Sequence, residues 1–221
     1  MRPTSTCGTF EQPSGKPNPD RMATQQEIDA AFARLREEWN RAERAIKIAE
    51  QVEGEIVNPA IYELRYAGRR IVEAYDVVGT DPGSALQRLQ DAQFDCCRAR
   101  HDAIDAATSK MVATLDNSQE KLGIDVVTTH FAEFPAMIQS LGEVRDKIAI
   151  SRERREDRDA IYASIEAVDL VELTKVFSRF RACEPLMRES AHRNRRQLFG
   201  SKIFGWAGVI GLIITVLTIF L

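Results

Sequence analysis

The chain has 221 residues, with 30 lysines and arginines against 33 aspartates and glutamates, so its formal net charge is −3. Residues 188–202 hold a net charge of +4, which leaves −7 on the remainder. This acidic bulk argues against general nucleic-acid binding. The four cysteines form no C-x-x-C pair and no zinc spacing. A chain of this length can bury the core of one helical domain or of two small ones.

Residues 1–21 form the first predicted segment, a tail rich in Pro, Gly, Ser and Thr that has no apolar stretch. This composition predicts disorder and excludes a secretory signal. Met22 opens the strongly helical part of the chain. We therefore interpret Met22 as the true start, with Met1 and a genuine flexible tail as the alternative.

Three long helices are predicted next, over residues 25–54, 59–79 and 84–115. The first begins at a capping box formed by Thr24 and Glu27 and carries an apolar heptad pattern typical of a coiled coil. The second begins at Asn58-Pro59, a common helix start. Short connections favour antiparallel neighbours, so we expect a helical bundle. Its predicted core contains Phe32, Leu35, Trp39, Leu64, Ile71, Phe94 and Ile104.

The chain after the third helix is predicted to be helical with interruptions. Residues 116–118 indicate a break, and residues 119–129 stay undecided between helix and strand. A fourth helix is expected from Phe134 past Ile165, with its highly charged middle as a solvated, salt-bridged face. Pro185 should kink or restart a fifth helix. The fold class of this part is therefore all-α.

One cluster has residue types suited to catalysis, His101-Asp102 with Asp105 one turn later. A metal-dependent phosphohydrolase would need further ligands, and the other histidines, His130 and His192, have no suitable neighbours. His101 also lies on the apolar stripe of its helix, which favours a buried core histidine. We therefore predict a protein that is not an enzyme and needs no metal or cofactor.

One helix face combines tyrosines with arginines at positions i, i+3, i+4 and i+7. Guanidinium groups bind phosphates and tyrosine rings stack on bases, so this face is a candidate site for a nucleotide or a short oligonucleotide. The alternative is an ordinary surface whose arginines pair with Glu63 or Glu73. The candidate residues are Tyr62, Arg65, Tyr66, Arg69 and Arg70.

The C-terminal residues 203–221 carry no charged side chain and are long enough for a transmembrane helix. The basic segment 188–202 precedes them, so the positive-inside rule predicts that the helical domain over 22–187 is cytoplasmic. We therefore expect a tail-anchored, single-pass protein, in the inner membrane if the organism is bacterial. Its predicted contacts with anionic lipid headgroups are Arg188, Arg193, Arg195, Arg196 and Lys202.

Small and polar residues recur along one side of this apolar segment with a 3-4-3 spacing. Such a stripe lets transmembrane helices approach closely, which predicts a homo-oligomer and is also compatible with a pore. The alternative is a monomeric anchor in which the spacing has no role. The residues of the stripe are Gly208, Gly211, Thr215 and Thr218.

The predicted layout, a helical domain joined to a short hydrophobic segment, resembles small membrane effectors of bacterial anti-phage defence systems. The resemblance implies that the helical domain oligomerises and senses a ligand or partner, after which the assembled anchors disrupt the membrane. The alternative function is a tether or scaffold that recruits a cytoplasmic partner. The layout is also similar to syntaxin-type SNARE proteins, but Pro185 and the arginines that follow it interrupt the heptads that a SNARE motif requires.

Overall fold

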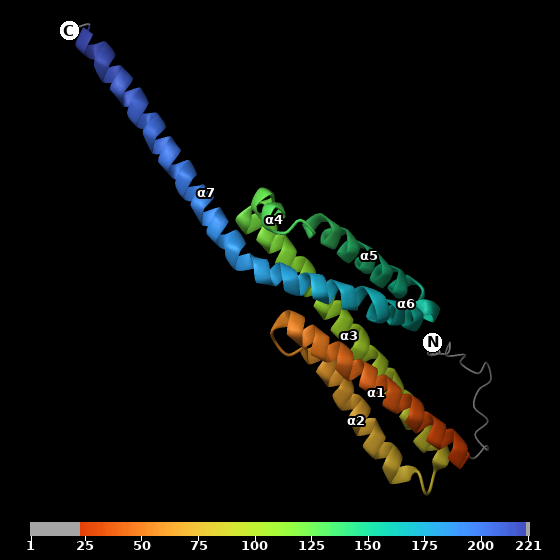
Figure 1. The fold of residues 1–221 in the computed structure, drawn as a ribbon. Helices are drawn as coiled ribbons and strands as arrows, with labels where there is room; N and C mark the ends of the chain where they lie inside the picture. The colour runs from red at the N-terminus through yellow and green to blue at the C-terminus, as the bar shows by residue number, and fades with distance from the viewer. Residues whose placement is uncertain (1–22, 220–221) are drawn as a thin grey trace. The chain divides into compact units, whose positions relative to one another are not determined.

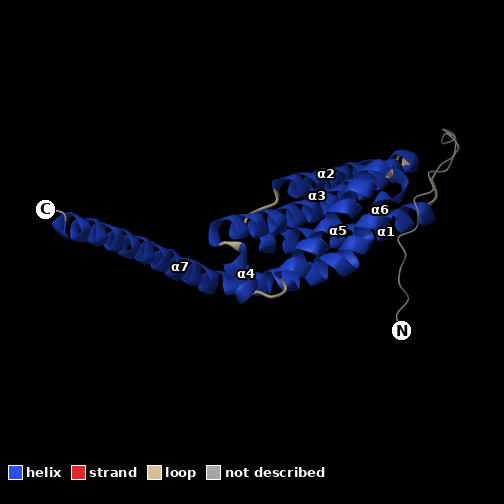
Figure 2. Cartoon of the chain, turned by 90° about the horizontal axis from the view of Figure 1, so that it is seen from above, coloured by secondary structure: helices blue, strands red, loops and turns tan. Residues whose placement is uncertain are grey.

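The computed structural model describes residues 23–219, with side chains described as far as residue 196. Every described element is a helix (Figures 1 and 2). In chain order they are α1 (Gln25–Glu53), α2 (Asn58–Val77), α3 (Pro82–Leu122), α4 (Ile124–His130), α5 (Phe134–Glu153), the 3₁₀ turn η1 (Arg155–Asp157), α6 (Arg158–Ser164), the π-helical turn η2 (Ile165–Asp169) and α7 (Leu170–Ile219).

The chain forms two compact units. The first unit takes in the residues up to 113 together with 138–175, and the second takes in 114–137 together with the chain from 176 onward. Three helices, α3, α5 and α7, therefore contribute to both units. The predicted disordered tail over residues 1–21 lies outside the described residues.

The start of α1 in the first unit matches the predicted capping box. The backbone N–H of Glu27 donates to the hydroxyl of Thr24 at 3.3 Å, and the backbone N–H of Thr24 donates to the carboxylate of Glu27 at 2.8 Å. The two bonds satisfy donors that a helix start leaves unpaired. The helix ends where Gly54 adopts a φ of 77°, a left-handed conformation that favours glycine.

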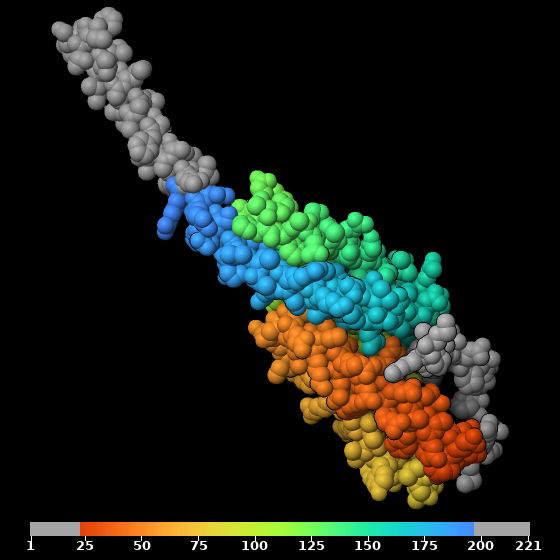
Figure 3. Space-filling model, viewed as in Figure 1, coloured from red at the N-terminus to blue at the C-terminus, as the bar shows by residue number. Residues whose placement is uncertain are grey.

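The helices α1, α2 and α3 pack through small side chains. The buried side of α2 consists of Ala60, Ala67 and Ala74, with Glu63 beside them. Alanines let helix backbones approach closely, and α1 and α2 lie side by side (Figures 1 and 3). The rest of this core is also rich in alanine, with Ala42, Ala45, Ala49, Ala92, Ala99, Ala103 and Ala107 fully or almost fully buried.

The predicted core is partly right. Leu35 and Ile104 are buried, but Phe32 exposes 38% of its surface and Phe94 exposes 64%. The predicted core consists of large side chains, whereas the closest helix contacts lie on alanines. Because the closest contact lies on the alanines, the two phenylalanines are turned to the outside of the bundle.

The predicted break at residues 116–118 is wrong, because α3 continues to Leu122. In the second unit the hydroxyl of Ser118 donates to the carboxylate of Glu184 at 3.5 Å, so this polar residue faces a partner instead of ending the helix. The helix ends at Gly123, which has a φ of 88°. The undecided segment after it forms helix α4 and no strand.

The predicted fourth helix is interrupted in its charged middle. The hydroxyl of Ser151 is buried and donates to the carbonyl oxygen of Ile148 at 2.6 Å, a local bond that competes with the helical pattern. α5 ends at Glu153, and the chain passes through η1 into α6. The turn η2 follows directly, so the connection to α7 is π-helical.

The core of the second unit is aromatic. The ring of Phe180 on α7 lies 5.5 Å from that of Phe131, 6.0 Å from that of Phe134 and 6.4 Å from that of Phe177, measured between centroids.

Pro185 lies inside α7 without restarting the helix, contrary to one of the two predicted outcomes.

The predicted transmembrane helix over residues 203–221 is contradicted. Among the residues that the structure describes, no helix is both long enough and apolar enough to cross a bilayer. A span requires about 20 predominantly apolar residues in succession. As far as residue 196, the last with a described side chain, α7 carries many charged residues, among them Lys175, Arg179 and Arg188. The predictions of a tail anchor, a single-pass membrane localisation and a pore depend on that helix and are therefore wrong as well.

The alanine packing of α2 predicts the effect of overfilling it. Ala67 is completely buried, so Ala67→Leu should lower the free energy of unfolding by about 1–3 kcal/mol. Urea denaturation of the full chain measures the change. Ala33→Leu adds the same group at an exposed position of α1 and should leave stability unchanged. Equal stability of the two variants would show that α2 does not pack closely.

Candidate functional site

The outward side of α2 carries large aromatic and aliphatic side chains. Tyr62, Tyr66 and Tyr75 expose 54%, 55% and 76% of their surface, and Val72 exposes 61%. Together with their exposed neighbours they cover the part of α2 that its buried alanines leave open. We call it the α2 surface and define it by Ile61, Tyr62, Arg65, Tyr66, Arg69, Val72 and Tyr75.

Four of the five predicted ligand-binding residues lie on this surface, and the fifth, Arg70, does not. Arg69 is exposed, and its Nε donates to Glu73 at 2.9 Å. Arg65 forms no ion pair or hydrogen bond with any residue that the structure describes. Arg70 instead turns to α3, where its Nε donates to Asp95 at 2.7 Å and one terminal nitrogen donates to Asp91 at 3.0 Å.

Ion pairs set the register between α2 and α3. Arg98 on α3 contacts Glu63 on α2 at 2.7 Å, and Arg70 contacts Asp95. Burial raises the pKa of Glu63, and the positive charge of Arg98 opposes that shift. On α3, Phe94 lies between Asp91 and Asp95, which both pair with Arg70 of α2.

Phe94 therefore extends the α2 surface onto the neighbouring helix. Sequence reasoning missed this residue because it placed the phenylalanine in the core. A signal was present in the charges: Asp91, Asp95 and Arg98 lie on one side of α3, beside Phe94, and complement the charges of α2.

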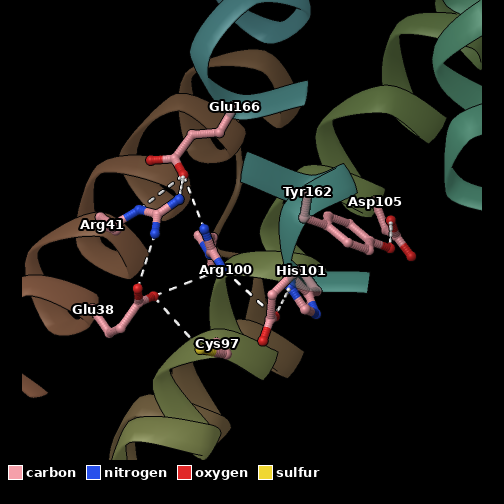
Figure 4. A network of polar contacts seen from close by, with 9 residues as sticks. Glu38, Arg41, Cys97, Arg100, His101, Asp105, Tyr162 and Glu166 are labelled. Carbon is pink, nitrogen blue, oxygen red and sulfur yellow. Dashed lines mark hydrogen bonds and ion pairs between the residues drawn. The ribbon is translucent and has the colours of Figure 1, made fainter. Parts of the chain in front are cut away.

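A second arrangement is a buried network of charges around Arg100. Figure 4 shows residues of α1, α3 and the segment from α6 to η2 pointing toward one another. The guanidinium of Arg100 is fully buried. One terminal nitrogen donates to Glu166 at 3.2 Å, and the other lies 3.7 Å from oxygens of Glu38 and Asp159. We call this set, together with Arg41, the arginine network.

Arg41 completes the network on the α1 side. It donates to Glu38 at 2.9 Å and, through two nitrogens, to Glu166 at 3.2 and 2.9 Å. Each of the two glutamates thus faces both arginines. A buried charge requires such partners because desolvation of an isolated ion is costly. Arg100 was not among the predicted residues, although an arginine among the alanines of α3 was a signal of a buried ion.

His101 is buried beside this network, as predicted for a core histidine. Its ring stacks on Tyr162 with centroids 3.9 Å apart. Its Nε2 lies 3.1 Å from Asp159, a close polar contact without the alignment of a hydrogen bond. Burial lowers the pKa of His101, and Arg100 adds to the effect. The contact with His101 holds the pKa of Asp159 below its ordinary value.

The cluster His101-Asp102-Asp105 does not converge on one point. Asp105 accepts hydrogen bonds from the hydroxyl of Tyr162 at 2.7 Å and from Arg152 at 3.1 Å, while His101 faces Tyr162 and Asp159. Within the described residues, no three His, Cys, Asp or Glu side chains are placed to hold a metal ion. The arrangement is suited to holding helices together.

The buried cysteines of α3 are poor nucleophiles. Burial raises the pKa of Cys96 to about 12 and raises that of Cys97 further. The thiol of Cys97 donates to Glu38 at 3.5 Å, at the edge of the arginine network. A thiol must ionise to attack, and these two remain protonated at neutral pH.

The arginines of α7 that were predicted to contact lipid headgroups differ in their contacts within the chain. Arg193 pairs with Glu189 at 3.1 Å, and a terminal nitrogen of Arg195 donates to the backbone oxygen of Lys121 at 2.7 Å. Arg188 lies 3.6 Å from Glu184. Arg196 is exposed. The side chains of Lys202 and of the predicted stripe, Gly208, Gly211, Thr215 and Thr218, lie outside the described residues.

In the part of the chain that the structure describes, the helices thus present an exposed aromatic surface and enclose a buried charge network. No protein-family model matches the chain, and no curated protein and no solved structure matches it.

Removal of the central charge tests the arginine network. Arg100→Met leaves Glu38 and Glu166 with one partner fewer in a buried site, so the free energy of unfolding should fall by about 3–5 kcal/mol. Adding Glu166→Gln to this variant should restore part of the loss, because Arg41 and Glu38 then remain as a balanced pair. Urea denaturation measures both variants. No recovery in the double variant would assign the loss to packing alone.

His101 predicts a pH dependence of stability. Its pKa lies below the ordinary value of 6.5 in the folded chain, so the unfolded chain takes up the proton first as the pH falls. The contribution to stability is present above pH 6.5 and is lost as the pH falls from there toward the folded pKa. His101→Gln should flatten this dependence, as measured by urea denaturation at several pH values. His130→Gln, a histidine outside the network, should leave it as in the parent chain.

Proposed function

We propose that this protein is a non-catalytic helical scaffold that binds a partner protein through the α2 surface and Phe94. The observation that carries the proposal is the set of half-exposed aromatic side chains on two helices whose register is set by ion pairs. Exposed apolar patches of this kind commonly mark protein interaction sites. Tyrosine and arginine are also the residues that most often supply the binding energy of interfaces.

The charges favour a protein partner over a nucleotide or oligonucleotide. Two of the three candidate arginines are paired, Arg70 with Asp91 and Asp95 and Arg69 with Glu73. These carboxylates weaken the positive potential that phosphate binding requires. Arg65 remains to meet a carboxylate at the rim of an interface, while the tyrosine rings contact apolar side chains.

The α2 surface also costs little to order on binding. Glu63, Arg70 and Glu73 tie α2 to α3, and alanines pack the opposite side of α2. Tyrosine has few rotatable bonds, so its immobilisation loses little entropy. A rigid backbone with aromatic side chains is suited to tight binding because fewer ordering costs oppose association.

A membrane-disrupting effector is not proposed, because that function depended on a C-terminal transmembrane helix. Self-assembly of the helical bundle does not depend on a transmembrane helix. The test below therefore includes binding to a second copy of this chain as one of its outcomes. The proposed partner presents an apolar patch with a carboxylate at its edge.

Photo-crosslinking tests the proposal. The chain with p-benzoylphenylalanine in place of Tyr66 should give a crosslink in native host cells to one discrete protein, which mass spectrometry identifies. The same label in place of Ile150, an exposed residue of α5, should not give it. With the identified protein, Tyr62→Ala with Tyr66→Ala should weaken binding about 30-fold or more, since one hot-spot side chain contributes about 2 kcal/mol.

The outcome also separates a partner from a second copy. A crosslink between two copies, with concentration-dependent sedimentation that the double variant abolishes, would identify a homo-oligomer. Identical crosslinks from positions 66 and 150, or unchanged binding in the double variant, would contradict a role for the α2 surface.

A further inference from the structure

The second unit contains a basic hollow between the end of α3 and α7. Its volume is about 240 Å³. Among the residues that the structure describes, no carboxylate lines it, although the chain as a whole is acidic. The hollow is lined by Lys121, Leu122, Arg188, Ala191, His192 and Arg195.

The nearby carboxylates are already shared among other groups. Glu184 lies 3.6 Å from both Arg181 and Arg188 and accepts a hydrogen bond from Ser118 at 3.5 Å. One carboxylate cannot neutralise two guanidinium groups, so positive charge remains on the side of Arg188. A cluster of like charges without a counter-ion is unfavourable, and an anion in the hollow would relieve it.

Arg195 is positioned by the chain itself. One terminal nitrogen donates to the backbone oxygen of Lys121 at 2.7 Å, which satisfies a free carbonyl at the end of α3. A guanidinium has five N–H donors, so the others remain for a ligand. The C-terminal end of α3 adds a partial negative charge of about half an elementary charge. This is less than the combined positive charge of Lys121, Arg188 and Arg195, so the hollow remains positive.

We propose that this hollow binds a phosphate group, carried by a small phosphorylated molecule. Arg188 and Arg195 provide planar donors that match phosphate oxygens, and Lys121 adds a point charge. Leu122 and Ala191 supply an apolar wall for the attached group. The volume lies just below the range of pockets that hold drug-sized ligands, which fits a phosphate with a small substituent. The site is in the second unit and is independent of the α2 surface.

Calorimetric titration of the full chain with inorganic pyrophosphate tests the site. The parent chain should bind with one site. Lys121→Gln and Arg188→Gln should each weaken binding about tenfold or more, because each removes a charge-assisted hydrogen bond. Arg193→Gln is the matched control: it removes the same charge from α7, but Arg193 does not line the hollow and pairs with Glu189. Its affinity should equal that of the parent chain.

A vesicle arm identifies the source of the phosphate. Flotation with phosphatidylserine vesicles and with pure phosphatidylcholine vesicles should show no binding that depends on Lys121 or Arg188 if the ligand is a free molecule. Binding to the anionic vesicles alone, lost in both variants and kept in Arg193→Gln, would assign the hollow to a lipid-borne phosphate. Absence of binding in both arms, or equal weakening by Arg193→Gln, would overturn the proposal.

Discussion

The arrangement of the first unit depends on the burial of one charge, that of Arg100. A guanidinium removed from water requires carboxylates at close range, and here they come from α1, α6 and η2. Replacement of such a set by apolar residues often leaves stability equal or higher, whereas removal of a single partner is costly. A shifted register of the helices would leave a buried ion without a partner, so the network favours the observed register.

The π-helical turn η2 belongs to the same constraint. Glu166 lies in this turn, and its carboxylate accepts hydrogen bonds from both Arg41 and Arg100. A π-helical turn changes the phase of the residues that follow it. The chain can therefore direct Glu166 toward the arginines and still bury Leu170 and Leu173 at the start of α7.

Packing through alanine explains why aromatic side chains are available for binding. When alanines form the closest helix contacts, larger residues one position away are displaced to the outside. Phe94 and the tyrosines of α2 are therefore exposed although the unit is well packed. The second unit uses phenylalanines for its core and gathers positive charge at the end of α3. The two units thus present different chemistry, apolar and aromatic in one and anion-binding in the other.

The sequence by itself determined the helical class, helices α1 and α2 and the cap of α1, because capping residues, glycines and helical periodicity act locally. It also placed His101 in the core and four of the five candidate residues on one face of α2. Only the tertiary structure decided that Arg70 turns to α3, that Phe94 faces outward, and that Arg100 meets Glu38 and Glu166. Those outcomes depend on contacts between residues far apart in the chain. Periodicity says which residues share a face of a helix, but it does not say which face a neighbouring helix will cover.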